Sequence, residues 1–358
     1  MTKNNEHKNL NVPDLRFPEF SGEWVETELQ DIVPNICSGK DRISNSGEVA
    51  LYGSTGVIGR TNSASYKENI VLVARVGANA GQMQIGNAPC GVTDNTLVID
   101  AKEWNYYIYY FLQHYNLNRL VFGSGQPLIT GGMLKRIKVR YGCKAERNNI
   151  TRLLCLIDER IATQNKIIEA LKLLRDAISG LIFNSMKNEK TILLGNVACI
   201  SNGSGDVQDS DSIKRDGWYP FFDRSEEQKW FPTYSFNREA IIYAGEGQNF
   251  FPRYYKGKFA LHQRCYAITD FCECLLPKYC LYFMNTLNSY FIRNAVGSTV
   301  PSLRMDMFQK AKIKIPTIER QQEIVSTLDA LSLKCENEEI VRALYNTQKS
   351  YLLQQLFI

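Results

Sequence analysis

The sequence is poor in histidine and lacks the short motifs of several common enzyme classes. Three histidines among 358 residues make histidine-based acid–base catalysis a weak hypothesis. No G-x-x-x-x-G-K-[S/T] phosphate loop occurs, which argues against ATP hydrolysis by this chain. The N-P-P-[F/Y] and D-P-P-[Y/F] tetrapeptides, with which amino-methyltransferases hold a flipped base, are also missing. The sequence therefore predicts no catalytic residues and a chain that is not an enzyme on its own.

The sequence also lacks long apolar runs. No stretch of about 18 apolar residues occurs, so we expect no membrane-spanning segment. The polar opening MTKNNEHKNLNVPDL has no apolar core, so we expect no signal peptide. Ten cysteines without a secretory signal favour reduced thiols in a cytoplasmic protein. The net charge of +5 permits nucleic-acid binding without requiring it.

Two clusters could imitate metal or nuclease sites, and we favour neither. His262, Cys265, Cys272, Cys274 and Cys280 lie close together, but paired C-x-x-C knuckles are missing. We expect these cysteines to be buried and free, with the C-x-C pair in a strand and both thiols on one face. The string PFFDRSEEQK (220–229) carries the residue types of a nuclease motif, but too close together to occupy separate strands. We predict no metal site.

One passage occurs twice. GSGQPLITGGMLKRIKV (123–139) aligns without a gap with GSTVPSLRMDMFQKAKI (297–313), 174 residues later, and similar patterns continue for about 60 residues. Residues 134–141 and 308–315 alternate as strands do, and each is followed by a pattern of period 3.5. A change of period at the same place in both copies predicts a duplicated unit.

The period of 3.5 predicts two long helices of about 38 residues, each roughly 55–60 Å long at 1.5 Å per residue. Neither helix could bury its apolar stripe alone, so we expect the two to pair with each other. Polar Gln164 and Arg175 interrupt the first stripe, and Glu338, Arg342 and Lys349 interrupt the second. The predicted apolar seam consists of Ile150, Leu154, Ile157, Ile161, Ile168, Leu171, Ile178 and Ile182 in the first helix, with Ile324, Leu328, Leu331, Cys335, Tyr345, Leu352 and Leu356 in the second.

The segments before the helices also correspond in order. Residues 29–40 and 194–203 predict a strand and a Ser/Asn–Gly turn, 70–82 and 240–250 a buried strand and a glycine turn, and 106–113 and 279–285 a short aromatic helix. We predict an α+β fold with two globular units, each followed by a long helix, and a mostly antiparallel sheet in each unit. The predicted domains are 1–143 and 188–317, and the helices occupy 144–187 and 318–358.

These passages resemble the DNA-specificity subunits of Type I restriction-modification systems. The similar segments are VPDLRFPEFSGEW (12–24), LYGSTGVIG (51–59), VARVGANAGQ (73–82), the passage at 123–139, and ERNNITRLLCLIDERI (146–161). Each motif alone is weak, and the ordered, doubled set is specific. The chain departs from the family pattern at Gly142, where the second copy has Pro316, at Arg147 in place of the usual glutamine, and at Arg320, which aligns with Glu146.

The resemblance implies two target-recognition domains held apart by an antiparallel coiled coil. It implies a non-catalytic subunit that binds double-stranded DNA and scaffolds two methyltransferase subunits together with restriction subunits, in a system of DNA methylation and phage defence. S-adenosylmethionine, ATP and Mg²⁺ are expected on those partners, and this chain is expected to hold no cofactor. Exterior residues of the first helix, such as Arg160, Lys166, Glu169 and Lys172, are then candidates for docking.

A helical spacer of about 55 Å would span about 16 base pairs, so we expect a bipartite target with an unread gap. The two units differ in sequence, so the target should be asymmetric. DNA contacts are expected from basic and amide side chains on loops, where glycines such as Gly53, Gly56, Gly77 and Gly81 let the backbone approach the duplex. The candidates are Lys40, Arg42, Ser54, Thr55, Arg60, Arg75, Asn79, Gln82 and Gln126 in the first unit, with Arg224, Lys229, Gln248, Asn249, Arg253, Lys256, Arg264 and Arg293 in the second.

Other interpretations remain open at this point. The run FFPRYYKGKF (250–259) fits a nucleic-acid face and a hydrophobic hairpin with charged edges about equally. The chain could also be a nuclease or methyltransferase with a coiled-coil arm, although the missing motifs argue against it. A third alternative is a coiled-coil adaptor that binds only protein, without specific DNA readout. Salt separates the first and third hypotheses, because DNA binding weakens steeply as salt rises and apolar docking does not.

Overall fold

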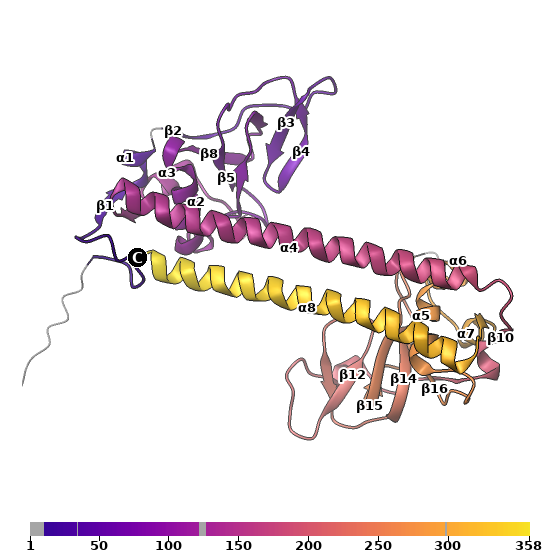
Figure 1. Ribbon diagram of the computed structural model, residues 1–358. Helices are drawn as coiled ribbons and strands as arrows, with labels where there is room; N and C mark the ends of the chain where they lie inside the picture. Colours follow the sequence, from indigo (N-terminus) through magenta and orange to yellow (C-terminus); the bar gives the residue numbers. More distant parts are fainter. Residues whose placement is uncertain (1–10, 34, 122–126, 298) are drawn as a thin grey trace, which may run out of the picture. The chain divides into compact units, whose positions relative to one another are not determined.

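The chain forms two compact units (Figure 1), and the computed structural model describes residues 11–33, 35–121, 127–297 and 299–358. Unit one contains residues 1–165 and 340–358, and unit two contains residues 166–339. Each unit joins a β-rich region to parts of two long helices. None of the helices in the described ranges is both long and apolar enough to cross a membrane.

Unit one is centred on a four-stranded sheet of order β2–β8–β5–β6, in which every neighbouring pair is antiparallel. The apolar strand β5 is buried along its whole length. A second sheet has the order β4–β3–β7, and β1 pairs with β9. The strands are β1 (Val25–Glu28), β2 (Asn35–Ser38), β3 (Val49–Gly53), β4 (Gly56–Thr61), β5 (Ile70–Ala74), β6 (Met83–Gly86), β7 (Cys90–Val92), β8 (Thr96–Asp100) and β9 (Lys138–Tyr141); the short helices are α1 (Leu29–Ile32), α2 (Asn105–Tyr115) and α3 (Gly131–Lys135).

Unit two repeats this plan with one larger sheet of order β11–β16–β14–β15–β12–β13. Its β12–β15 pair is parallel, as is the β3–β7 pair of unit one. The strands are β10 (Thr191–Leu193), β11 (Cys199–Asn202), β12 (Tyr219–Phe222), β13 (Lys229–Phe231), β14 (Phe236–Ala244), β15 (Arg253–Leu261), β16 (Cys265–Thr269) and β17 (Lys312–Lys314); the short helices are α5 (Pro277–Asn285), α6 (Asn288–Asn294) and α7 (Met305–Gln309). The predicted mostly antiparallel α+β fold is confirmed.

The structure keeps the offset of the sequence repeat. Helices α3 and α7, strands β9 and β17, and the two long helices α4 (Lys144–Ser185) and α8 (Ile318–Leu356) each begin 174 residues apart. The prediction of continuous strands at 134–141 and 308–315 is wrong at their amino-terminal ends, which belong to α3 and α7. Thr130 caps α3 by accepting a hydrogen bond from the Met133 amide at 3.3 Å, so a capped helical turn forms before the strand.

The long helices close the core of each unit. In unit one, Ile150, Leu154 and Ile157 of α4 share a buried cluster with Leu352 and Leu356 of α8, next to α2 (Figure 1). The Lys349 ammonium group lies 2.6 Å from the Asp158 carboxylate. The start of one helix therefore packs beside the end of the other, which is an antiparallel arrangement.

Unit two has the same arrangement with the opposite helix ends. Phe183 and the half-buried Ile178 and Ile182 of α4 pack in one cluster with Ile324 and Leu328 of α8. This confirms the predicted antiparallel pairing of the helices. At 1.5 Å per residue, α4 with its 42 residues is about 63 Å long and α8 with its 39 residues about 58 Å.

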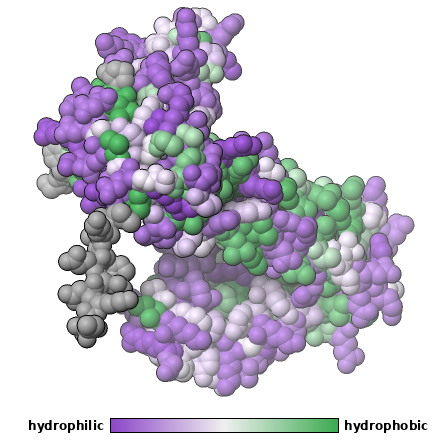
Figure 2. Space-filling model, turned by 60° about the vertical axis from the view of Figure 1, so that its left-hand side comes forward, coloured by the Kyte–Doolittle hydropathy of each residue, from purple (hydrophilic) through white to green (hydrophobic). Residues whose placement is uncertain are grey.

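The remaining predicted seam positions differ in exposure. Ile168 and Cys335 are buried, whereas Ile161, Leu171, Leu331 and Tyr345 are only half-buried. Several large apolar side chains of the helices face outward instead, and the hydropathy of one molecular face is mapped in Figure 2. Leu173 and Leu181 of α4, both in unit two, are the most exposed of these, at 72% each.

One cysteine prediction is wrong. Cys272 and Cys274 lie in a turn after β16, not in a strand, and their sulfurs are joined in a disulfide. They are therefore neither free nor fully buried, in contrast to Cys265 and Cys280, which are free and buried as predicted. Strand β16 ends at Thr269, Asp270 has a positive φ of 52°, and the Leu275 amide donates to the Cys272 carbonyl at 3.0 Å, so the strand does not reach the two cysteines.

Candidate nucleic-acid interface

The loops of both units are held by the same main-chain frame. In unit one, strands β2 and β5 end, and strand β8 begins, at the same edge of the sheet. In unit two, β11 and β14 end, and β16 begins, at the equivalent edge. We call this the loop edge; it comprises residues 38–41, 53–56, 74–82 and 92–96 in unit one, with residues 202–206, 223–225, 244–249 and 261–265 in unit two. Equivalent hydrogen bonds join Gly39 N to Thr96 O and Gly203 N to Cys265 O, Asp41 N to Val92 O and Gly205 N to Leu261 O, and Thr93 N to Tyr52 O and His262 N to Phe222 O.

The described residues at and after the proline of the repeated G-S-x-x-P passage hydrogen-bond to the loop edge. The Gly77 amide donates to the Pro127 carbonyl at 3.0 Å, and the Gly247 amide donates to the Pro301 carbonyl at 3.1 Å. Both glycines have positive φ, 80° and 156°, which favours glycine at the turn. Two further equivalent bonds run from Ile129 N to Arg75 O and from Leu303 N to Gly245 O. The described part of each passage is thus a strap across the loop that follows the central strand.

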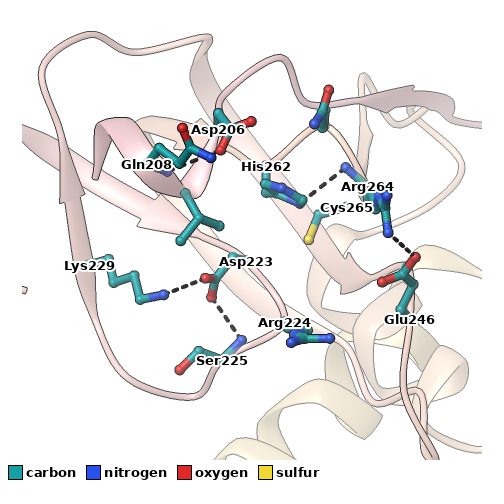
Figure 3. Close-up of a pocket in the computed structure, with 13 residues that line it drawn as sticks. Asp206, Gln208, Asp223, Arg224, Ser225, Lys229, Glu246, His262, Arg264 and Cys265 are labelled. Atoms are coloured by element: carbon teal, nitrogen blue, oxygen red, sulfur yellow. Dashed lines mark hydrogen bonds and ion pairs between the residues drawn. The ribbon is translucent and has the colours of Figure 1, made fainter. Parts of the chain in front are cut away.

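The loop edge of unit two surrounds a cavity of about 600 Å³ (Figure 3). Its lining comes from all four loops and is rich in charged and amide groups. The Arg264 guanidinium and the Glu246 carboxylate form an ion pair at 2.7 Å, and their side chains are 66% and 22% exposed. Arg224 is exposed on the neighbouring loop. The lining side chains drawn with labels are Asp206, Gln208, Asp223, Arg224, Ser225, Lys229, Glu246, His262, Arg264 and Cys265.

Two of the predicted contact residues stabilise the cavity wall. The Lys229 ammonium group pairs at 2.7 Å with Asp223, which is buried. Arg253 donates to the carbonyls of Asp223 and Ser225, the latter at 2.8 Å, and its guanidinium lies over the Phe222 ring. Desolvation by burial lowers the pKa of Arg253. These contacts fix the loop after β12, so Arg253 supports the wall of the cavity from within.

The loop edge of unit one presents smaller polar side chains. Ser54 donates to the Asn95 carbonyl at 3.1 Å, and Arg75 donates to the Ser38 hydroxyl at 3.3 Å. Arg75 Nε and Thr96 Oγ1 are buried and have no hydrogen-bond partner among the described residues. Most buried polar groups in proteins are hydrogen-bonded, so these two atoms are exceptions, and both belong to loop-edge residues.

The predicted residues separate into three groups. Lys40, Ser54, Thr55, Arg75, Asn79 and Gln82 in unit one belong to the loop edge or directly adjoin it, as do Arg224, Lys229, Gln248, Asn249, Arg253 and Arg264 in unit two. Arg42 is exposed and directly follows the loop-edge segment 38–41. Arg60, Lys256 and Arg293 lie elsewhere on their units: Arg60 donates to the Glu48 carbonyl at 2.8 Å, Lys256 lies 3.9 Å from Glu239, and Arg293 is on α6. Gln126 falls outside the described residues.

Sequence reasoning missed several residues of the edge. Asn95, Glu246, His262 and Gln263 were not among the candidates, although the structure places them at equivalent turns. A signal was present, since TDN (93–95) and HQR (262–264) are polar triplets directly before the fully buried or nearly fully buried strands β8 and β16. Comparing these two triplets would have found the site.

The aromatic run and the cysteine-rich region have structural roles. Phe250 and Phe259 are buried, and residues 253–261 form strand β15, so the hairpin interpretation describes most of this run. In the described ranges, no group of three or more histidine, cysteine and acidic side chains is placed to hold a metal ion.

The departures from the family pattern also have local partners: Gln321 is fully buried, whereas Arg147, which aligns with it, stacks 3.5 Å from the Trp104 ring centre.

Two copies of one α+β unit, each with the same loop edge and its own long-helix segments, define the architecture of a duplicated recognition protein. The family model described as "Type I restriction modification DNA specificity domain" matches residues 21–173 and 186–343. The chain therefore belongs to the DNA-specificity subunits of Type I restriction-modification systems, a family whose members are not themselves catalytic.

Individual relatives agree with this assignment. The specificity subunit of the Type I restriction enzyme EcoDI from Escherichia coli is 32% identical over 149 residues, which are 41% of this chain and 32% of the relative. The match thus spans about a third of that relative's length. The crystal structure of the S subunit from M. genitalium has a TM-score of 0.68 at 15% identity and covers 97% of this chain and 99% of its own.

A second solved chain, from a study of complex assembly and conformational transition of the type I R-M system, has a TM-score of 0.56 at 13% identity, with coverage of 96% and 99%. At such low identity these two likenesses support the fold alone.

Proposed function

We propose that this chain is the subunit that reads the DNA target of a Type I restriction-modification complex and scaffolds its methyltransferase and restriction subunits. The observation that carries the proposal is the loop edge, which occurs twice with the same main-chain frame and different side chains. A conserved frame that carries different side chains suits two modules that perform the same task on different sequences. We therefore expect an asymmetric target in two parts, with residues 1–143 and 188–317 reading one part each.

The chemistry of the edge supports DNA as the ligand. Arginine, lysine and amide side chains position a duplex through phosphates and read base edges in the grooves. Unit two gathers Arg224 and Arg264 around its cavity, and unit one places Lys40, Ser54 and Arg75 on or beside its edge. The chain's net charge of +5 favours the same partner without specifying it.

The long helices are the proposed docking surface for the partner subunits. Their outward faces carry the charged residues Arg160, Lys166 and Glu169, and also exposed apolar side chains such as Leu173 and Leu181. S-adenosylmethionine, ATP and Mg²⁺ are proposed to bind the partners and not this chain. The proposal includes a cytoplasmic location, where these cofactors and the DNA are available.

The test is to express this chain with the methyltransferase subunit of its own system in a host that lacks adenine methylation, and to map N6-methyladenine across the genome. We expect a two-part asymmetric motif with a fixed unread gap. Replacing residues 1–143 by the first unit of another family member should change one part only. A continuous motif, or a recovered complex that methylates nothing, would overturn the proposal and favour the protein-binding adaptor.

A further inference from the structure

The shared frame makes individual side chains of the two loop edges comparable. The Ile129–Arg75 and Leu303–Gly245 main-chain bonds, and the isolated bridges Val76–Leu128 and Glu246–Ser302, place Val76 of unit one at the position of Glu246. The turns that begin at Thr93 and His262 carry the same hydrogen bonds, which places Asn95 at the position of Arg264. Each edge therefore has a corresponding pair of side chains, Val76 with Asn95 and Glu246 with Arg264.

The two members of each pair are neighbours on adjacent loops. In unit two, the carboxylate of Glu246 and the guanidinium of Arg264 are 2.7 Å apart and line the cavity (Figure 3). In unit one, the amide of Arg75, the residue before Val76, donates to the Asn95 carbonyl at 3.1 Å. Asn95 is exposed and Val76 half-buried. Both pairs thus lie at an edge that is open to a ligand.

The Glu246–Arg264 pair adds little to the stability of the fold. Solvent screens an ion pair in which one side chain is as exposed as that of Arg264, so the attraction between the two charges is weak. The two charged groups can therefore separate and bind a ligand with little loss of stability. A carboxylate only accepts hydrogen bonds and a guanidinium only donates them, so the pair offers an acceptor and a forked donor side by side.

The chemistry of the two pairs matches different base pairs. In the major groove, arginine donates to guanine O6 and N7, and a carboxylate accepts from cytosine N4; asparagine pairs with adenine N6 and N7, and apolar side chains contact the thymine methyl group. We infer that Glu246 and Arg264 read a G·C pair in the half-site of unit two, and that Val76 and Asn95 read an A·T pair in the half-site of unit one. This inference rests on the proposed function.

The experiment uses the full chain in complex with its methyltransferase subunit and compares methylation maps. Arg264→Asn should relax one G·C position in a single half of the motif, with selectivity there falling about 5- to 150-fold, the loss of one bidentate contact. The other half should stay unchanged. The reciprocal change, Asn95→Arg, should lower selectivity at an A·T position in the opposite half and should favour guanine there.

A matched control comes from the other end of the same strands. Arg238, in β14, pairs at 2.6 Å with Asp270, which directly follows β16. Arg238→Asn therefore removes an equivalent exposed ion pair away from the loop edge and should leave the motif unchanged. Recovery of each complex with its methyltransferase subunit reports folding independently of the motif.

The outcomes separate the inference from the proposed function. If the wild-type complex methylates a two-part motif but Arg264→Asn and Asn95→Arg alter no position, or alter the same positions as Arg238→Asn, the inference is wrong and the proposed function stands. The inference also fails if the position relaxed by Arg264→Asn is an A·T pair. If the wild-type complex methylates no specific sequence, both fail together.

Discussion

Single residues explain why the two copies diverge where their long helices begin. Glu146 is 1% exposed and forms a two-pronged ion pair with Arg16, whose Nε and Nη2 lie 2.7 and 2.9 Å from its carboxylate oxygens. The hydrogen bond to Glu146 raises the pKa of Arg16. Arg320 occupies the equivalent place in α8 and instead forms an exposed pair with Glu323. The same position of the repeat therefore binds the amino-terminal segment through a buried carboxylate in unit one, and is an exposed surface residue in unit two.

This contrast predicts the effect of removing each arginine. Arg16→Ala leaves a buried carboxylate without its partner and should lower the free energy of unfolding by about 3 kcal/mol. Arg320→Ala removes an exposed pair and should cost less than about 1 kcal/mol. Urea unfolding at pH 7 measures both. Equal losses would show that burial of Glu146 is not the cause.

Buried thiols predict a loss of stability at high pH. Desolvation by burial raises the pKa of Cys90 and of Cys265 from the usual 9.0 to about 11. The fold therefore favours the neutral thiols, and their contribution is complete below about pH 9 and is lost as the pH rises towards 11. The free energy of unfolding, measured with reductant present, should fall across this interval.

Two variants isolate the thiol contribution. Cys265→Ala should make the decline between pH 9 and 11 shallower, although it lowers stability at every pH because it opens a small cavity. Cys199→Ala removes an exposed thiol and should leave the slope unchanged. A Cys265→Ala protein with the wild-type slope would exclude Cys265 as the titrating group.

At the scale of elements, the hydrophobic period predicted secondary structure correctly over long segments and less well over short ones. The seam of α4 and α8 repeats over about forty residues, so the helices and their pairing followed from the pattern. Residues 134–137 are too few to separate a helical turn from a strand, and the hydrogen bond from the Met133 amide to Thr130 favoured the helix. The C-x-C pair was wrongly predicted to lie in a strand, because two residues are too few to show a hydrophobic period.

The loop edge was harder to predict for a different reason. Lys40, Ser54 and Arg224 follow strands and have residue types that contact DNA, so they could be proposed from sequence. The side-by-side placement of Glu246 and Arg264 depends on strand pairing between β14 and β16, which joins residues about twenty positions apart. Arg253 was proposed as a contact because its type fits, whereas its burial against Asp223 is a matter of packing.

The helices offer a direct test of which seam residues carry stability. Leu154 is fully buried in the core of unit one, and Leu173 of the same helix is 72% exposed. Leu154→Ala should lower the free energy of unfolding by about 3 kcal/mol, and Leu173→Ala by less than about 0.5 kcal/mol. Chemical denaturation followed by circular dichroism measures both. A large loss for Leu173→Ala would mean that its face is covered in solution.

At the scale of the whole molecule, the last residues of the chain pack into the core of unit one, which is formed mainly by the first part of the chain. Phe357 packs against Tyr107 and Phe111 of unit one, with ring centres 5.4 and 6.0 Å apart, and the Leu15 amide donates to the Gln355 carbonyl at 3.0 Å. Leu352 and Leu356 belong to the same buried cluster. Unit one is therefore incomplete until the last residues of α8 have been made.

This closure predicts a local effect from a distant change. Removal of residues 352–358 should increase amide hydrogen exchange in β5 and β8 of unit one, because their core loses several buried side chains, and should leave β14 and β16 of unit two protected. Phe357→Ala is the milder variant, with an expected cost of about 3 kcal/mol. Equal deprotection of both units would show that they unfold as one.

The loop edge is held by main-chain hydrogen bonds, and this has a consequence for how such a protein can change over generations. Side chains at positions 76, 95, 246 and 264 take no part in that frame through their own atoms, apart from the exposed Glu246–Arg264 pair. Substitutions there need not pass through a misfolded intermediate. If these positions read bases as we propose, a new target sequence needs only one or two point mutations in a single unit, while the other unit keeps the half-site that we propose for it.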